Sequence, residues 1–350
     1  MQTAVAAGIC FGDPDKELEV ISCAGEEDLC AMDEFLERTE ISIEKSPSEN
    51  PFDIQLHIFC GEDCAYVRII GQHTNVVRIE KNGEAILSKD FVEKPTPPCD
   101  RDKLNVADII EFADSVDLEK VRPVLKRQID YNMAIAEAGL CSSYGANIGK
   151  ILLQCCGDGM GAKAKAWAAA GSDARMSGCE LPVVINSGSG NQGITASVPV
   201  IVYAEDLGCG EEKLLRSLLV SNLVTIHLKT GIGSLSAYCG ATSAGAGAAA
   251  GINYMRGGSY REISNTIVNA LAINSGMICD GAKPSCAAKI ASAVESGLLG
   301  MEMIMHGSRF CEGEGIVIKD VESTIAAVSR IAREGMRSTD DEIIHQMIDV

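Results

Sequence analysis

The sequence is short of positive charge and of long apolar runs. Its 30 lysine and arginine residues stand against 49 aspartate and glutamate residues, so the net charge is −19 and the pI is about 4.7. This acidity argues against nucleic acid and anionic membranes as partners. The longest run of small and apolar residues, 240–252, is too short to cross a bilayer. Its glycine and alanine content favours close helix packing instead.

A secretion signal is also missing from the start of the sequence. Fifteen cysteines without such a signal indicate a reducing cytoplasm rather than a disulfide framework, and the odd count agrees. A length of 350 residues allows two domains or one large one. Hydrophobic residues make up 46% of the chain, which is enough for a sizeable core.

The first part of the chain shows the period of two that is typical of strands. Apolar and polar residues alternate around Ile41 and Ile43 and again around Leu56. The segments 76–80 and 85–88 flank Asn82-Gly83, which is a strong hairpin signal. We therefore expect an antiparallel sheet between residues 40 and 90.

A proline-rich segment, 93–100, separates this part from one with a helical period. The helical part includes a helix after Asp117 as its cap and a last helix that opens with a capping box at Thr339 and buries Ile344 and Met347. The predicted fold class is α+β. An antiparallel-sheet domain at 1–95, incomplete at its front because the chain opens within a helix-like stretch, precedes a mainly α-helical domain at 101–350.

Three cysteines lie beside glycine or other small residues in the helical part. Cys239 and Cys279 are 40 positions apart, and Cys286 follows seven positions later. Three soft sulfur ligands suit zinc or an iron–sulfur cluster. The spacing matches neither a zinc finger nor a ferredoxin, so ordinary buried cysteines remain the alternative.

Two further segments of the helical part could bind a small anion. We expect a loop at 172–176 in which Arg175 either holds a carboxylate or forms a structural ion pair. A second loop, 188–193, follows the strand-like segment 181–185 and matches G-x-G-x-x-G. We reject a dinucleotide site there because Pro199 falls where the phosphate-binding helix should continue. Free backbone N–H groups of this loop fit an amino-acid carboxylate instead.

Three segments resemble the signature sequences of the YhaM-like L-cysteine desulfidases, relatives of the alpha part of iron–sulfur L-serine dehydratases. They are Asn186-Ser-Gly-Ser-Gly-Asn-Gln-Gly-Ile-Thr195, Tyr238-Cys-Gly-Ala-Thr-Ser-Ala-Gly245 and Met277-Ile-Cys-Asp-Gly-Ala-Lys-Pro-Ser-Cys286. The resemblance implies that Cys239, Cys279 and Cys286 bind a 4Fe-4S cluster. The expected substrate-binding residues are Ser187, Gly188, Ser189, Asn191, Gln192 and Arg175.

The resemblance also implies a reaction, the β-elimination of L-cysteine to pyruvate, ammonia and sulfide. One motif of that family, Gly-Cys-Thr-Glu-Pro with its expected catalytic base, is absent from this sequence. We expect that the chain starts late within the family's N-terminal domain, or that a separate chain supplies the segment. Within the chain, His73 in Gly71-Gln72-His73-Thr74-Asn75 is the substitute candidate for the base, and a turn histidine is the alternative.

Three alternative functions stay open at this point. They are an L-serine dehydratase, a degenerate cluster- or zinc-binding protein without catalysis, and the nucleotide-binding oxidoreductase that the loop at 188–193 argues against. We further expect a cytoplasmic homo-oligomer that acts on a small amino acid.

Overall fold

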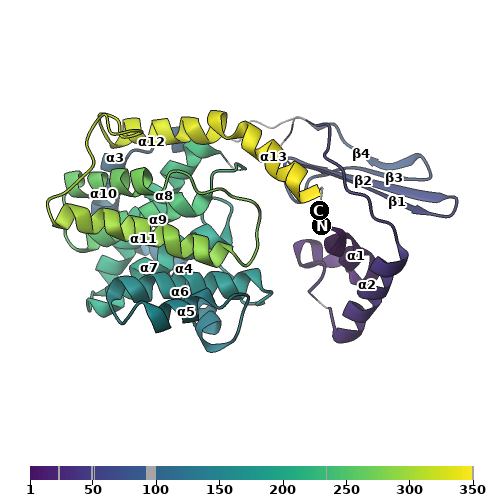
Figure 1. The fold of residues 1–350 in the computed structure, drawn as a ribbon, viewed down its shortest axis with the longest axis horizontal. Helices are drawn as coiled ribbons and strands as arrows, with labels where there is room; N and C mark the ends of the chain where they lie inside the picture. Colours follow the sequence, from purple (N-terminus) through teal and green to yellow (C-terminus); the bar gives the residue numbers. More distant parts are fainter. Residues whose placement is uncertain (23, 49, 51, 92–99, 234, 349–350) are drawn as a thin grey trace. The chain divides into compact units, whose positions relative to one another are not determined.

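The computed structural model describes residues 1–22, 24–48, 50, 52–91, 100–233 and 235–348. The chain divides into two compact units (Figure 1). The first comprises Met1–Pro97 together with Asp341–Val350, and the second comprises Pro98–Asp340. The proline-rich segment predicted as a linker lies, up to position 99, outside the described residues.

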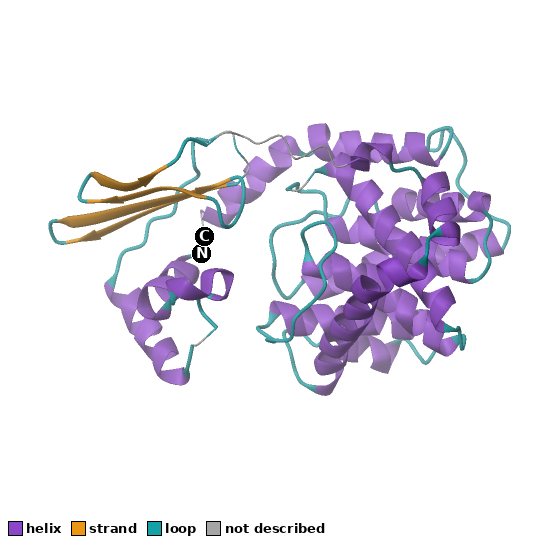
Figure 2. Cartoon of the chain, turned by 180° about the vertical axis from the view of Figure 1, so that it is seen from behind, coloured by secondary structure: helices purple, strands orange, loops and turns teal. Residues whose placement is uncertain are grey.

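The first unit combines short helices with one four-stranded antiparallel sheet (Figure 2). Neighbouring strands in the sequence are neighbours in the sheet, so every connection is a hairpin. The elements are α1 (Gln2–Phe11), η1 (Pro14–Glu19), α2 (Glu26–Arg38), β1 (Asp53–Cys60), β2 (Asp63–Ile70), β3 (Val76–Lys81) and β4 (Glu84–Ser88). A small cluster of Ala6, Ala7 and Met32 joins α1 to α2.

The predicted hairpin between β3 and β4 is confirmed. Its turn residues Asn82 and Gly83 both have positive φ angles, 52° and 83°, as the twist-matched two-residue hairpin turn requires. The Asn82 side chain also accepts a hydrogen bond of 2.8 Å from the backbone N–H of Cys64.

The strand predicted around Ile41 and Ile43 is wrong. Residues 39–46 form neither helix nor strand, and the carbonyl of Ile41 accepts a hydrogen bond from the Gln2 side chain instead. Alternation alone does not make a strand, because a strand needs a neighbouring strand for its backbone groups. Among the described residues, the sheet contains no strand beyond β1 on that edge.

The second unit is helical, so the α+β fold class is confirmed. Its elements are η2 (Asp100–Lys103), α3 (Val106–Ser115), α4 (Leu118–Cys141), α5 (Ile148–Cys155), α6 (Met160–Met176), α7 (Gly190–Asp206), α8 (Glu211–Ile232), α9 (Gly240–Met255), α10 (Tyr260–Ile273), α11 (Cys286–Met305), α12 (Val321–Arg330) and η3 (Ile331–Gly335). The predicted cap of α4 is confirmed, since the Asp117 side chain accepts a 3.1 Å hydrogen bond from the Glu119 N–H. The last helix, α13 (Arg337–Ile348), begins in this unit and continues into the first.

The centre of the second unit is α9, which packs against α7, α8, α10 and α11. Every residue from Ala241 to Met255 is buried. Glycines allow the backbones to approach on two sides, because a Cβ at Gly245 would lie 2.3 Å from the Ala293 carbonyl of α11, and one at Gly247 would lie 2.6 Å from the Ser221 carbonyl of α8. The close packing expected for 240–252 is confirmed.

Several predicted boundaries in this unit are wrong. The segment 172–176 is the last part of α6, not a loop, and 181–185 is irregular, not a strand. Helix α7 runs through Pro199, although an interior proline costs about 3 kcal/mol of helix propensity. Because α7 is buried along most of its length, tertiary packing outweighs this cost.

The last helix also differs from its prediction. Helix α13 begins at Arg337, two residues before the expected cap Thr339, and none of its described residues is buried. Ile344 is 39% exposed and Met347 is 47% exposed, so the apolar period of this segment does not mark a buried face. Within the described residues, no helix combines the length and apolarity needed to span a bilayer.

Candidate functional site

A short antiparallel bridge holds two of the three predicted cysteines side by side in the second unit. Tyr238 pairs with Ile278 across this bridge. The Cys239 N–H donates to the Met277 carbonyl at 3.0 Å, and the Cys279 N–H donates to the Ala237 carbonyl at 2.6 Å. Two segments 40 positions apart in sequence are therefore fixed to one another by their backbones.

A hydrogen bond between the two thiols of this pair shifts their pKa values in opposite directions. Cys239 is buried and donates, and the pKa of Cys279 is lowered, first by that hydrogen bond and then by the Gly281 N–H and the charges of Lys289 and Lys229, against the effect of burial. The same hydrogen bond and burial raise the pKa of Cys239. Cys279 is thus the member of the pair that carries negative charge first.

Cys286 is the first residue of α11, at the end of the loop that Cys279 begins. Its Sγ atom lies 3.6 Å from the Gly281 carbonyl oxygen. Across the ranges that the structure describes, no group of three or more histidine, cysteine, aspartate or glutamate side chains is arranged to hold a metal ion. The structure therefore brings together Cys239 and Cys279, while the Cys286 thiol is directed to the Gly281 carbonyl.

Two lysines beside the cysteine pair did not emerge from the sequence patterns. Lys229 of α8 is only 6% exposed, and burial lowers its pKa while the charges of Cys279 and Cys239 favour its cationic form. Lys289 of α11 donates 2.8 Å to the Ile278 carbonyl and pairs with Asp280. The signal for Lys229 was a lysine within the apolar stretch of α8, since lysine is rarely buried without a partner.

The predicted anion-binding segment starts α7. Ser187 and Gly188 have φ angles of 49° and 82°, and two backbone hydrogen bonds between Asn186 and Ser189 close the turn around them. The Ser189 hydroxyl caps α7 by accepting from the Gln192 N–H at 3.4 Å. A 17-residue helix begins here, so its positive end and free N–H groups favour an anion.

Arg175 lies directly against this helix start. Its Nη1 donates to the Asn191 side-chain oxygen at 3.3 Å, and a Cβ on Gly190 would meet the Arg175 Nε at 2.3 Å. Burial lowers the Arg175 pKa, whereas its electrostatic interaction with Cys286 acts in the opposite direction. Arg175 therefore lies against the helix start and interacts electrostatically with the third cysteine, and the structure shows no carboxylate paired with it among the described residues.

Gln192 connects the helix start to the cysteine pair. A Cβ on Gly240, the residue after Cys239, would lie 2.5 Å from the Gln192 side-chain amide. The N-termini of α7 and α9 therefore meet, and Arg175, Asn191 and Gln192 belong to one site with the cysteine pair.

His73 lies elsewhere in the chain. It is an exposed turn residue of the first unit, and its ring packs 4.6 Å from the ring of Phe52 at 50°. Its role as a base stays a prediction.

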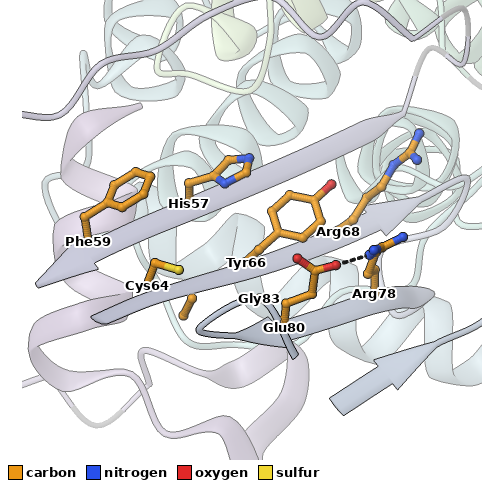
Figure 3. Close-up of a pocket in the computed structure, with 9 residues that line it drawn as sticks. His57, Phe59, Cys64, Tyr66, Arg68, Arg78, Glu80 and Gly83 are labelled. Atoms are coloured by element: carbon orange, nitrogen blue, oxygen red, sulfur yellow. Dashed lines mark hydrogen bonds and ion pairs between the residues drawn. The ribbon is translucent and has the colours of Figure 1, made fainter. Parts of the chain in front are cut away.

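The sheet of the first unit has a hollow on one of its faces (Figure 3). His57, Phe59 and Tyr66 contribute aromatic rings to it. The two arginines of its lining are paired, Arg68 with Asp53 at 2.6 Å and Arg78 with Glu80. Both arginines of the hollow are therefore already neutralised by a carboxylate, and neither is free to bind an anionic ligand.

A family profile described as serine dehydratase alpha chain matches residues 15–345. The chain belongs to this family, which is named for a lyase. It is 53% identical to a UPF0597 protein of Desulfitobacterium hafniense over 99% of this chain and 81% of the relative. UPF0597 proteins of Treponema denticola (46% identity, 99% and 82%) and Lachnoclostridium phytofermentans (45%, 99% and 84%) are also similar along their shared length.

Proposed function

We propose that this protein is an iron–sulfur-dependent lyase that eliminates sulfide from L-cysteine to give pyruvate and ammonia. The observation that carries the proposal is the bridge between Tyr238 and Ile278, which fixes the Cys239 and Cys279 thiols next to the anion-binding start of α7. Soft ligands and an anion subsite within one buried region suit a small amino acid with a thiol.

The donor set fits a thiophilic group. Cys239 and Cys279 are in contact, Cys279 favours its thiolate, and Lys229 and Lys289 offset the negative charge of thiolates. In this proposal Cys286 is the third ligand of a 4Fe-4S cluster. When bound by three thiolates, such a cluster supplies one open iron as a Lewis acid for a sulfur leaving group.

The chain's own residues bind and orient the substrate. The Arg175 guanidinium and the N–H groups of Ser187, Gly188, Gly190 and Asn191 hold the carboxylate, and burial excludes water around it. Elimination breaks the Cα–H and Cβ–S bonds, forms the Cα–Cβ double bond and releases sulfide. The resulting aminoacrylate hydrolyses to pyruvate and ammonia.

A base must take the α-proton. The cysteine of a Gly-Cys-Thr-Glu-Pro segment, which these 350 residues do not contain, is the first candidate, and His73 is the candidate within them. General-base help is worth about 10²–10⁴-fold in rate. Comparison of His73→Ala with the unchanged chain, each with and without a peptide carrying that segment, separates the two candidates.

The family match favours a second candidate, the dehydration of L-serine. The same site would then release water instead of sulfide. Thiolate affinity for iron favours cysteine, so we rank this activity second.

The test is an anaerobic purification of the full chain. We expect a brown protein with about four irons and four sulfides per chain. L-Cysteine should then yield sulfide and pyruvate in equal amounts, while pyruvate from L-serine alone would select the second candidate. A colourless preparation with one zinc per chain would contradict the cluster, and a brown protein without turnover on either amino acid would indicate a cluster-binding protein without catalysis.

A further inference from the structure

A buried amide oxygen next to the cysteine pair has no protein donor. Gln192 is 6% exposed, and its Oε1 atom has no hydrogen-bond partner within the part of the chain that the structure describes. Native proteins pair the large majority of their buried polar atoms, because an unpaired one destabilises the fold. An orphaned acceptor inside a candidate site is therefore a sign of a missing donor.

The position of this amide is fixed from two sides. Gln192 belongs to the first turn of α7, and its amide packs on Gly240 of α9, where a Cβ would lie 2.5 Å from Cδ and 2.8 Å from Oε1. Any side chain at Gly240 would clash with the amide and displace it. The side-chain oxygen of the adjacent Asn191 already accepts a hydrogen bond from Arg175 at 3.3 Å, so of these two amides only Gln192 has an oxygen without a donor.

The charges around the site identify the donor. Arg175 and the buried Lys229 favour anionic groups of a ligand, namely a carboxylate and a thiolate, whereas Lys289 is already paired with Asp280. An α-amino acid has one further group, an ammonium with three N–H donors and no acceptor. A neutral amide oxygen accepts from it without adding a negative charge beside the thiolates and the carboxylate.

We infer that the Gln192 side-chain oxygen accepts a hydrogen bond from the substrate's α-ammonium and thereby selects α-amino acids over the same acids without the amine. The inference rests on the proposed function. A site built around such a bond discriminates strongly, because the analogue leaves the buried acceptor unpaired. Gly240 is the spacer that keeps the amide in place.

Two inert ligands that differ only in the amine test the inference. L-Alanine and propionate have no leaving group, and ligand titrations followed by NMR give their dissociation constants for the anaerobically purified full chain. We expect L-alanine to bind roughly 10- to 150-fold more tightly than propionate, the range expected for a hydrogen bond to a charged group. Gln192→Met should bind both equally, and Gln192→Glu should keep the preference.

A second buried glutamine provides the matched control. Gln128 is 3% exposed, but its amide is paired in both directions with Asn222, at 2.9 and 2.7 Å. Gln128→Met should lower the urea midpoint of unfolding and leave the amine preference unchanged. Gln192→Met should leave the urea midpoint undiminished and abolish the amine preference, since removal of an orphaned acceptor does not destabilise the fold.

The outcomes separate this inference from the proposed function. If Gln192→Met keeps the preference for L-alanine, or if the unchanged protein shows none, the inference is wrong. Pyruvate release from L-cysteine by the unchanged protein is scored independently and decides the proposed function by itself.

Discussion

The two units of this chain bury their side chains very differently. In the second unit an entire helix, α9, is buried from Ala241 to Met255. In the first unit the buried hydrophobic residues are Ala6, Ala7, Met32, Ile70 and Val77 among those that the structure describes. Apolar strand residues such as Ile54 and Phe59 are 51% and 76% exposed. A period of two or of 3.6 thus identifies an element, but a covering layer decides whether its apolar face is buried.

The predicted site lies in the more deeply buried unit, and this has a physical reason. A bridge of two backbone hydrogen bonds, a buried lysine and an unpaired amide oxygen need surroundings that exclude water and do not relax. The close packing of α9 on α8 and α11 provides such surroundings directly behind Cys239.

Removal of a thiol at the site should give the largest effect. We expect Cys279→Ser or Cys286→Ser to abolish the retention of iron, because a hydroxyl is a poor ligand for a soft metal. Cys155→Ser at the exposed end of α5 and Cys209→Ser are the controls and should leave the iron content unchanged. Loss of iron from Cys155→Ser together with full retention in Cys279→Ser would show that the ligand assignment is wrong.

The same glycine-to-alanine change should have opposite effects in the two units. Gly245→Ala places a Cβ 2.3 Å from the Ala293 carbonyl, so two helices must move apart, and we expect a loss of about 3 kcal/mol in unfolding free energy. The single tryptophan, Trp167 in α6, reports urea unfolding of this unit by its fluorescence.

Gly8→Ala in α1 is the matched change in the first unit. No atom lies within 4 Å of the added Cβ, and we expect a gain of about 0.5–1 kcal/mol from helix propensity. Slower hydrogen exchange of the α1 amides would show this gain in stability. If Gly245→Ala is as mild as Gly8→Ala, the close packing of α9 is not what holds the second unit together.

Much of this architecture could be predicted from local signals. The Asn82-Gly83 turn and the Asp117 cap carry their structure in a few adjacent residues, and both are confirmed. Pro199 misled because a local penalty was overcome by burial around α7. The capping box at Thr339 misled for the opposite reason, since α13 starts earlier and has no buried residue among those described.

The same distinction between local and long-range signals applies to the site. The cysteines and the start of α7 could be predicted because each lies in a short motif that resembles a known family. Lys229, Lys289 and the packing of Gln192 on Gly240 arise only when α7, α8, α9 and α11 meet. Contacts between elements distant in sequence leave no pattern within any single stretch.

A smaller effect should follow from the hairpin turn of the first unit. Gly83 has a φ angle of 83°, which an alanine adopts only with strain, so Gly83→Ala should cost about 1–2 kcal/mol locally. Hydrogen exchange of the β3 and β4 amides should accelerate, while the Trp167 transition stays unchanged. A shift of the Trp167 midpoint would mean that the two units unfold together.

The smallest expected effect is a pH dependence of the second unit. Glu322 of α12 pairs with His227 of α8 at 2.7 Å and accepts from the Val106 N–H at 2.8 Å. Burial raises its pKa, but the hydrogen bonds from His227 and Val106 outweigh burial and leave the pKa below its ordinary value.

A carboxylate with a lowered folded-state pKa stabilises the fold above its unfolded pKa of about 4.3, and this contribution disappears as the pH falls through the folded value.

Glu322→Gln keeps the size of the side chain and removes the charge. At pH 7 the variant should lose no more than about 1 kcal/mol, because the pair is partly exposed to solvent. The gap in the Trp167 urea midpoint between the two proteins should start to narrow as the pH drops below about 4.3, where the carboxyl of the unfolded chain takes up a proton, and it should close below the lowered folded-state pKa, where the native carboxyl is protonated as well. A midpoint gap that widens in acid would show that Glu322 acts through packing rather than charge. The contact of α12 with α8 and with the start of α3 would then be stabilised by packing alone.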